Sequence, residues 1–325
     1  MVLAEGVRSA VGMSGHDKVL GAMLGLAVGD ALGAPLEGAP RGVADRAVAR
    51  GLQMAHSERW AAGQWTDDTA LALELAESIA ERGLLDTEDL GRRYIRWATN
   101  DGGGIGHTTR AALVGAADAE DARKRAADFH ARTGLGASNG SVMRCTPIGL
   151  AARDLEKARD AAATDASLTH GHPAAARASS ALCVALLALG RGGDPVAAAR
   201  AEVHGSEDLE RALQLAADAD REVVAALATG RGAGSCSTTL AISFWALTSI
   251  GDYEQGVMWA ISLGGDTDTN AAVAGALLGR ARGAAAIPER WLKPLAQRER
   301  LENAGRALAE RAGSTERDHP SRSMP

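Results

Sequence analysis

Two acidic clusters contain the side chains best suited to chemistry in this sequence. The first reads WTDDT at residues 65–69, and the second reads GGDTDT at residues 264–269. Each cluster stands where a loop enters an expected helix. Capping therefore explains either cluster taken alone, because Asp and Thr are favoured at helix N-termini. One side chain is enough to cap a helix, however, and each cluster offers two carboxylates with hydroxyls beside them.

The donor atoms of the two clusters indicate the kind of ion that they would bind together. Four carboxylates packed without a cation would repel one another strongly. All of the donors are oxygens, with no Cys or His interleaved, and this favours hard cations such as Mg²⁺ or Mn²⁺ over Zn²⁺. We therefore expect two divalent cations, roughly 3.5–4 Å apart, that orient a substrate's hydroxyls and lower the pKa of a bound water.

The elements that would position these clusters are helices. Apolar residues recur at helical spacing along most of the chain. Glycines at 21, 25, 29 and 33 recur every four residues and predict a smooth ridge against which another helix packs closely. Helices are expected at about residues 16–32, 43–50, 67–82, 87–97, 118–130, 154–170, 174–189, 208–229, 238–250, 253–262 and 269–280.

Composition agrees with a single helical domain. Hydrophobic residues make up 46% of the 325 residues and charged residues 23%, which excludes global disorder. Aromatic residues are only 3%, which argues against an aromatic-rich β-sandwich. No Pro- or Ser-rich linker divides the chain. We expect an all-α fold with one compact domain over residues 16–312, a flexible N-terminus at 1–15 and a disordered tail at 313–325.

Charge and cysteine usage limit the partners and the compartment. A net charge of −6 gives no general attraction to nucleic acid or to an anionic membrane. The three cysteines are odd in number and lack metal-ligand spacing, so reduced core thiols and a cytoplasmic location are expected. The N-terminus lacks the pattern of a signal peptide, and no uninterrupted apolar stretch is expected to be long enough to span a bilayer.

Six motifs, in order along the chain, resemble those of the ADP-ribosylglycohydrolases. This family includes the dinitrogenase-reductase-activating glycohydrolase and the ADP-ribosyl-acceptor hydrolases. The motifs are GLAVGDALG at 25–33 with Glu37, WTDDT at 65–69, GIG at 104–106, NGSVMR at 139–144, TH at 169–170 and GDTDT at 265–269. The resemblance implies a compact orthogonal helical domain. It also implies hydrolysis of the bond between the anomeric carbon of the distal ribose of ADP-ribose and its acceptor.

The resemblance also implies roles for individual residues. Glu37 matches a glutamate implicated in catalysis, and Asp67 and Asp268 are the metal ligands expected to matter most for it. Asp30 could share a helix face with Glu37 or could support the metal shell. The implied metal ligands are Thr66, Asp67, Asp68, Asp266, Asp268 and Thr269. The residues implied to line the ADP-ribose cleft are Asp101, Gly104, Ile105, Gly106, Asn139, Gly140, Ser141 and His170.

The substrate implied by the resemblance is an ADP-ribosylated protein or small molecule. Arginine is the favoured acceptor, with other N- or O-linked acceptors open, and nucleic acid is expected only as a modified substrate. Some relatives carry an aromatic residue before the Asn-Gly pair, where this chain has Ala137 and Ser138. The contact with adenine would therefore differ here. We expect a monomer that has no contact with a membrane.

Two other functions remain open at this point. An inactive ADP-ribose-binding or structural protein, such as the lens crystallins that share this fold, could lose its carboxylates without penalty, yet the implied ligands and Glu37 are all present. A metal-dependent nucleotide phosphohydrolase could also use acidic clusters on helices. The ordered glycine motifs fit a glycohydrolase better.

Overall fold

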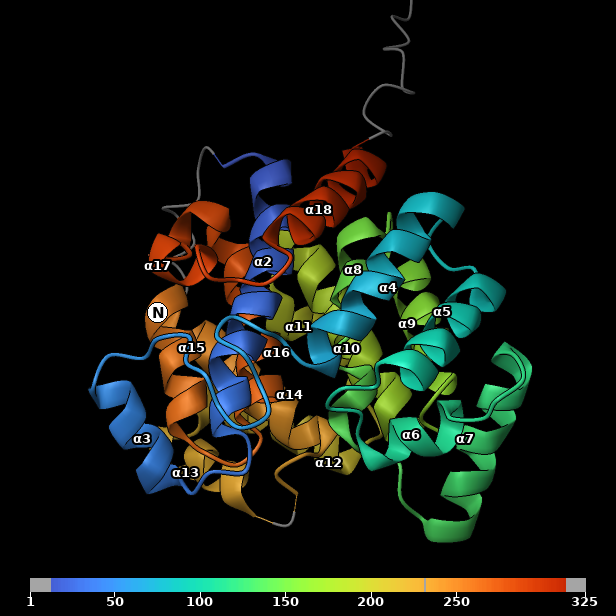
Figure 1. Cartoon of the computed structure of the whole chain (residues 1–325), viewed down its shortest axis with the longest axis horizontal. Coiled ribbons are helices and arrows are strands. Elements are labelled where there is room, and N and C mark those ends of the chain that lie inside the picture. The colour runs from blue at the N-terminus through green and yellow to red at the C-terminus, as the bar shows by residue number, and fades with distance from the viewer. Residues whose placement is uncertain (1–12, 231, 314–325) are drawn as a thin grey trace, which may run out of the picture.

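The computed structural model describes residues 13–230 and 232–313, and within these ranges every regular element is a helix (Figure 1). Only the single bridge between Ser138 and Ser235 pairs extended backbone in this part of the chain. The expected all-α fold is confirmed. The predicted flexible and disordered ends fall mostly outside the described residues. Ser14 caps the first described helix, and Gly313 ends the last one.

The helices are distributed along the whole described chain. In chain order they are α2 (Gly15–Gly33), η2 (Ala34–Leu36), α3 (Arg41–Ala49), α4 (Asp67–Arg82), α5 (Thr87–Asn100), α6 (His107–Leu113), α7 (Ala119–Thr133), η3 (Asn139–Ser141), α8 (Thr146–Ala151), α9 (Leu155–Ser167), α10 (Pro173–Gly190), α11 (Pro195–Val203), α12 (Glu207–Asp218), α13 (Arg221–Ala225), η4 (Ala226–Thr229), α14 (Cys236–Trp245), η5 (Ala246–Ile250), α15 (Tyr253–Ser262), α16 (Thr267–Arg282), η6 (Ala284–Ala286), α17 (Glu289–Leu292) and α18 (Arg298–Gly313).

The predicted glycine ridge is the central packing feature of the fold. On α2, a Cβ at Gly25 would lie 2.3 Å from the Gly275 carbonyl oxygen of α16, and a Cβ at Gly29 would lie 2.1 Å from the Ala271 oxygen. Because Gly21 meets Gly279 in the same way, the two helices run antiparallel. The C-terminal end of α2 therefore lies beside the N-terminus of α16, where the second acidic cluster begins.

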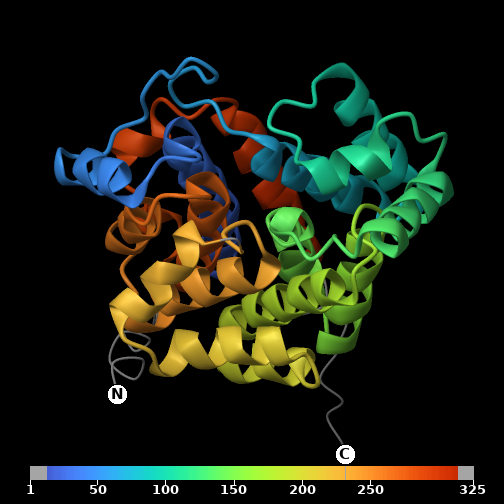
Figure 2. The same cartoon turned by 90° about the horizontal axis from the view of Figure 1, so that it is seen from below.

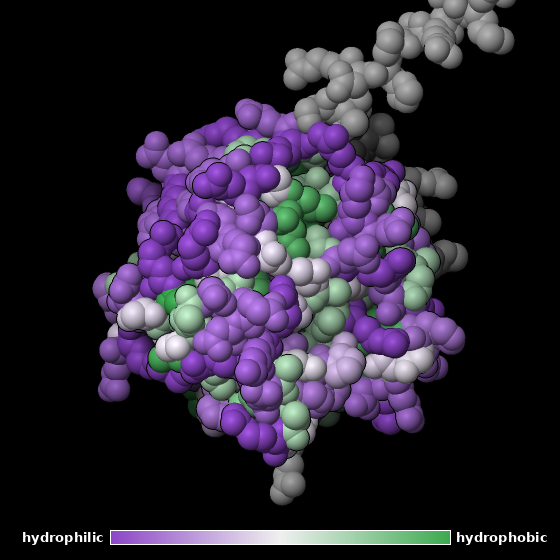
Figure 3. All heavy atoms as spheres, turned by 90° about the vertical axis from the view of Figure 1, so that its right-hand side faces the viewer, coloured by the Kyte–Doolittle hydropathy of each residue, from purple (hydrophilic) through white to green (hydrophobic). Residues whose placement is uncertain are grey.

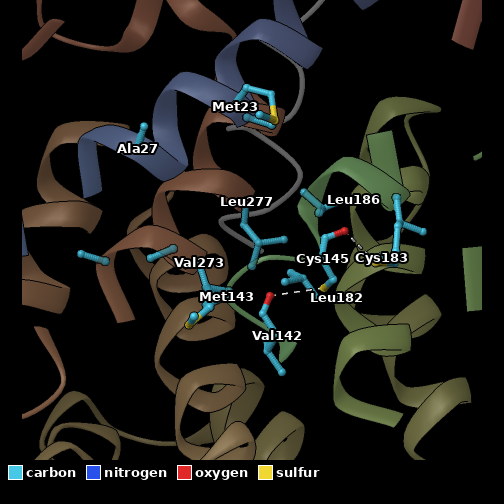
Figure 4. Close-up of a cluster of buried hydrophobic side chains, with 14 of the residues drawn as sticks. Met23, Ala27, Val142, Met143, Cys145, Leu182, Cys183, Leu186, Val273 and Leu277 are labelled. Atoms are coloured by element: carbon cyan, nitrogen blue, oxygen red, sulfur yellow. Dashed lines mark hydrogen bonds between the residues drawn. The ribbon is translucent and has the colours of Figure 1, made fainter. Parts of the chain in front are cut away.

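Apolar residues from the other helices close the core around this pair. In Figure 4, Met23 and Ala27 of α2 and Val273 and Leu277 of α16 lie near a group of side chains from the middle of the chain. That group comprises Val142, Met143, Cys145, Leu182, Cys183 and Leu186. All three cysteines are buried and free, as expected for reduced core thiols. Figure 2 shows the same helices from below.

Length and mean hydropathy are the criteria for a helix that could cross a membrane, and they allow the few charged residues that interrupt the apolar stretches of this chain. Two helical segments meet both criteria, Gly15–Leu36 with a mean hydropathy of 1.7 and Pro173–Gly190 with 1.5. In these segments, 83% and 61% of the apolar window is buried inside the fold. Their hydrophobicity thus matches their place in the core, and the face in Figure 3 is mostly hydrophilic.

Several predicted helix boundaries differ from the structure. The expected helix at 208–229 is broken after α12 at Ala219, and α13 and η4 complete the segment. Side chains from other helices take the carbonyls at this break, because Trp245 Nε1 donates to Ala219 O and Thr248 Oγ1 donates to Ala216 O. The expected helix at 238–250 becomes a π-helix from Ala246 onward. Helices α6, α8, α11, α17 and α18 were not predicted.

Candidate active site

One cleft of about 490 Å³ gathers residues from both acidic clusters and from two glycine-containing loops. Its walls come from the loop after η2, the first turns of α4, α6 and α16, and η3. The residues lining it are Glu37, Gly38, Asp67, Asp68, Gly104, Gly106, His107, Thr108, Thr109, Ser138, Asn139, Gly140, Met143, Ala233, Gly265, Asp266, Asp268 and Thr269. The chain segments that the sequence singled out therefore meet at one place.

Asp30 of α2 fixes the first turn of α4. Its fully buried carboxylate accepts hydrogen bonds from the backbone N–H groups of Thr66 and Thr69, each at 3.0 Å, and from Thr69 Oγ1 at 2.6 Å. Helix α2 ends at Gly33 and Glu37 follows the short η2, so the two residues do not continue one helix. Of the two roles considered for Asp30, the contacts support the structural one.

The first turns of α4 and α16 touch through Asp68. Its Oδ2 accepts from Thr66 Oγ1 at 3.2 Å and from Thr269 Oγ1 at 3.5 Å, although Asp68 and Thr269 are 201 residues apart. Its other oxygen, Oδ1, is buried and has no hydrogen-bond partner. An unpaired buried carboxylate oxygen is energetically costly, so a further ligand at this atom would be stabilising.

The electrostatics of the cluster are those of carboxylates crowded away from water. Burial first, and then the neighbouring carboxylates with Asp30 foremost, raise the pKa of Asp67 to about 7. Burial and neighbouring carboxylates also raise the pKa values of Asp68 and Asp268 well above their ordinary range. A positive charge in the cleft would reverse these shifts.

The carboxylates alone do not form a closed metal-ligand set. Within residues 13–230 and 232–313, no three Asp, Glu, His or Cys side chains are grouped so that they could hold a metal ion by themselves. Thr66 and Thr269 place hydroxyl oxygens beside Asp68. A cation held here would therefore complete its shell with hydroxyl or water oxygens, which suits Mg²⁺ because it usually retains several waters.

Asn139 connects η3 to the second acidic cluster. Its Nδ2 donates to Asp266 Oδ2 at 2.7 Å and to Thr239 Oγ1 at 2.9 Å. Asn139 was predicted to line the ADP-ribose cleft, and it does lie in the wall, but its amide is directed to Asp266. No sequence pattern predicted this contact, since the two residues lie 127 positions apart.

Glu37 lies at the mouth of the cleft and pairs with Arg59. Arg59 Nη1 is 3.2 Å from Glu37 Oε2, and its guanidinium lies over the Trp60 ring. Burial raises the pKa of Glu37, the Arg59 charge lowers it, and Asp266 raises it again. Sequence reasoning missed Arg59, which belongs to a long loop without a motif.

The glycines of the cleft allow backbone to approach the carboxylates. Gly104 has φ +87°, and a Cβ there would lie 2.5 Å from Asp67 Oδ1. Gly265, with φ +68°, exchanges backbone hydrogen bonds with the segment after Glu37, donating to Ala39 O and accepting from Gly38 N–H. These contacts hold the loop that carries Glu37 against the second cluster.

Not every predicted ligand-binding residue lines the cleft. Asp101 is exposed and Ile105 is buried, and neither belongs to the wall. Ser141 is fully buried and bonds to the side of α10 through Ala175 O and Ser179 Oγ. His170 is 2% exposed and lies behind the wall, in contact with Ser138.

Four further polar residues in the wall were not predicted. His107, Thr108 and Thr109 directly follow the predicted Gly104–Gly106 segment and begin α6, and Ser138 directly precedes Asn139. Their position next to those motifs was the available signal. In the described wall no residue is Phe, Tyr or Trp, which agrees with the absence of an aromatic residue before Asn139.

Comparisons with known proteins identify the family. The family model for ADP-ribosylglycohydrolase matches residues 13–318. The chain is 31% identical to ADP-ribosyl-[dinitrogen reductase] glycohydrolase of Rhodospirillum rubrum, over 87% of this chain and 92% of the relative. It is 29% identical to ADP-ribosylarginine hydrolase Tri1 of Pseudomonas putida, over 91% and 79% of the two chains.

A solved structure agrees with these sequence relatives. A chain described as ADP-ribosylglycohydrolase-related protein complex superposes with a TM-score of 0.70 and 35% identity, covering 92% of this chain and 99% of that one. The described fold and the matched sequence thus point to the same family. The chain belongs to the ADP-ribosylglycohydrolase family and is an ADP-ribosyl hydrolase.

Proposed function

We propose that this protein releases ADP-ribose from a modified acceptor with the help of two divalent cations, Mg²⁺ or Mn²⁺. The residues that would hold them are Thr66, Asp67, Asp68, Asp266, Asp268 and Thr269. The observation that carries the proposal is the crowding of Asp67, Asp68 and Asp268, whose pKa values are raised together, around a buried Asp68 oxygen without a partner. When bound, the cations would hold hydroxyls of the distal ribose and activate a water for attack at the anomeric carbon.

The protein's own residues have distinct tasks in this proposal. Asp30 holds the first turn of α4 in place, and Asn139 holds the carboxylate of Asp266. Glu37 stands at the cleft mouth with a pKa raised by burial, which suits a carboxyl group that accepts or returns a proton during the reaction. The surrounding glycines leave room for a ligand to approach the protein backbone.

Arginine is the acceptor that we favour. It is named in the ADP-ribosylarginine hydrolases of Pseudomonas putida and Serratia proteamaculans, and the Rhodospirillum rubrum relative is named for a modified protein, dinitrogen reductase. A modified protein is therefore the substrate class that we propose, and a cytoplasmic location remains our proposal as well.

An acceptor panel tests this choice. The purified protein is incubated with Mg²⁺ or Mn²⁺ and with proteins ADP-ribosylated on arginine or on serine, and with ADP-ribosylated nucleic acid. We expect release of free ADP-ribose from the arginine-linked protein at the highest rate. Faster release from serine or nucleic acid would overturn the acceptor assignment. Phosphate release, or binding without turnover, would instead favour the phosphohydrolase or the inactive binding protein.

A further inference from the structure

A chain of hydrogen bonds leads from the protein core to the cleft. It begins at Arg144, which is fully buried and pairs with the equally buried Asp165 at 3.2 Å. Arg144 also lies over the ring of Tyr94 and donates through Nη1 to Gly140 O. The guanidinium is therefore held from several sides and has no freedom to turn.

From Arg144 the chain passes through four side chains. Arg144 Nη1 is 2.8 Å from Thr169 Oγ1, which is 2.7 Å from Nδ1 of His170. The other ring nitrogen of His170, Nε2, is 3.0 Å from Ser138 Oγ. Ser138 Oγ in turn donates to Thr108 Oγ1 at 3.2 Å. Ser138 and Thr108 line the cleft, whereas the other members lie behind it.

The two ends of the chain set the direction of its bonds. An arginine can only donate, so Thr169 Oγ1 accepts from Arg144. Burial lowers the pKa of His170 to about 3, so the ring is neutral and only one of its nitrogens carries a proton. Ser138 Oγ donates to Thr108 and therefore accepts from Nε2, which leaves Nδ1 to accept the proton of Thr169 Oγ1.

The end of the chain is a hydroxyl whose proton is free. Thr108 Oγ1 already accepts from Ser138, and among the described residues its proton has no acceptor. The α6 turn and the η3 segment contribute hydroxyls, an imidazole and bare backbone to the wall, namely Gly106, His107, Thr108, Thr109, Ser138 and Gly140, whereas the carboxylates come from the loop after η2 and from the starts of α4 and α16. An anionic oxygen fits the first group of residues and would be repelled by the carboxylates.

We infer that the oriented chain from Arg144 makes the Thr108 hydroxyl a donor to an anionic phosphoryl oxygen of the ligand, with His170 as the positioning residue that fixes its direction. The inference rests on the proposed function, in which the diphosphate of ADP-ribose would supply that oxygen. It also gives His170 a role that differs from direct ligand contact, because the ring acts through Ser138.

Nitrogen NMR on histidine-labelled protein tests the direction of the chain. We expect His170, assigned by its loss in His170→Gln, to carry its proton on Nε2. Thr169→Val should remove this preference because Nδ1 loses its donor, whereas Thr169→Ser should keep it. A proton on Nδ1 in the wild-type protein would overturn the direction that we assign.

Binding measurements test the role of the hydroxyl. Calorimetry with ADP-ribose and with inorganic pyrophosphate should show about tenfold weaker binding for Thr108→Val, since a lost hydrogen bond to a charged group has that magnitude. His170→Leu should weaken both ligands similarly, and His170→Gln should rescue them because a glutamine amide can donate from the place of Nε2. Thr99→Val, which removes an exposed hydroxyl bonded to its own helix, is the matched control and should bind like wild type.

The outcomes separate this inference from the proposed function. If the wild type binds ADP-ribose and Thr108→Val binds both ligands equally well, the inference is wrong. If the wild type binds pyrophosphate through Thr108 but not ADP-ribose, the proposed function is wrong and the phosphoryl contact stands. If the wild type binds neither ligand, both are overturned.

Discussion

The carboxylates of the cleft are buried so close together that they cannot all be ionised without a compensating positive charge. Asp67, Asp68 and Asp268 are nearly fully buried, and no Arg or Lys is paired with any of them in the described structure. The raised pKa values of these three carboxyl groups reflect how unfavourable their ionisation is in this buried site. A bound cation would favour ionisation, so cation binding and proton loss should be linked.

Proton release on cation binding follows from these shifts. Below its raised pKa of about 7 Asp67 carries a proton in the free protein, and a cation favours the ionised form, so binding must expel that proton. Because Asp68 and Asp268 also have raised pKa values, Mn²⁺ binding should release about one proton or more at about pH 6 and fewer at about pH 8, with weaker affinity at the lower pH. Calorimetry in buffers of different ionisation enthalpy measures the release.

The control for this measurement is Asp67→Asn, which should release fewer protons at the lower pH. Binding that expels no proton at either pH would show that the carboxylates are already ionised in the free protein. The electrostatic basis of the proposed metal site would then be lost.

The residues of the candidate site could be predicted where they belong to a sequence motif. The acidic clusters, Glu37 and the Gly104 loop all reach the cleft that their chemistry suggested. Arg59 and the turn of Asn139 toward Asp266 could not be predicted, because both depend on contacts between distant segments. The position of His170 behind the wall could not be predicted either, because it too depends on such contacts.

Among the helices, the packing of α2 against α16 links the fold to the candidate active site. Their backbones approach closely enough that Cβ atoms at the shared glycines would overlap carbonyl oxygens. Helix α2 carries Asp30 near its C-terminal end, and α16 begins at the second acidic cluster. The spacing of these two helices therefore sets where Asp266 and Asp268 stand relative to α4.

Widening this contact should destabilise the protein. Gly29→Ala would place a Cβ 2.1 Å from Ala271 O, and the helices could accept it only by moving apart. We expect a loss of about 3 kcal/mol in the free energy of unfolding, the upper part of the usual range for overpacking. Denaturant titration measures it.

Gly15→Ala on the same helix is the matched control, because a Cβ at Gly15 would have no heavy atom within 4 Å. It should leave stability unchanged or raise it by roughly 0.5–1 kcal/mol. Equal stability of the two variants would mean that the close approach does not matter.

Helices could be predicted where their apolar periodicity was strong. Helices α2, α4 and α15 begin and end within about two residues of their expected bounds, a normal uncertainty for helix ends. The break after α12 depends on side chains from α14 and η5, which a local pattern cannot reveal. Helix α18 was missed although Leu301, Ala304 and Leu308 recur at helical spacing and are buried, a signal masked by its many charges.

For the whole molecule, the fold brings segments from every part of the chain to one cleft. The loop after η2, the start of α4, the α6 turn, η3 and the start of α16 each contribute to its wall. The apolar α2 and α10 that could by length cross a membrane are mostly wrapped by other helices. The two acidic clusters were expected to lie together, but the contacts of Asn139 with Asp266 and of Gly104 with Asp67 emerged only from the structure.

Metal-dependent release of ADP-ribose decides whether the two acidic clusters form a catalytic metal site. The wild-type protein should release ADP-ribose from an arginine-modified protein in Mg²⁺ or Mn²⁺, and a chelator should abolish this release. Asp67→Ala and Asp268→Ala should each lower turnover by about 100-fold or more with unchanged helical circular dichroism. Asp252→Ala, which removes only an exposed helix cap, should keep wild-type turnover. Full turnover in chelator or in either site variant, or no release in metal from any modified acceptor, would contradict the account.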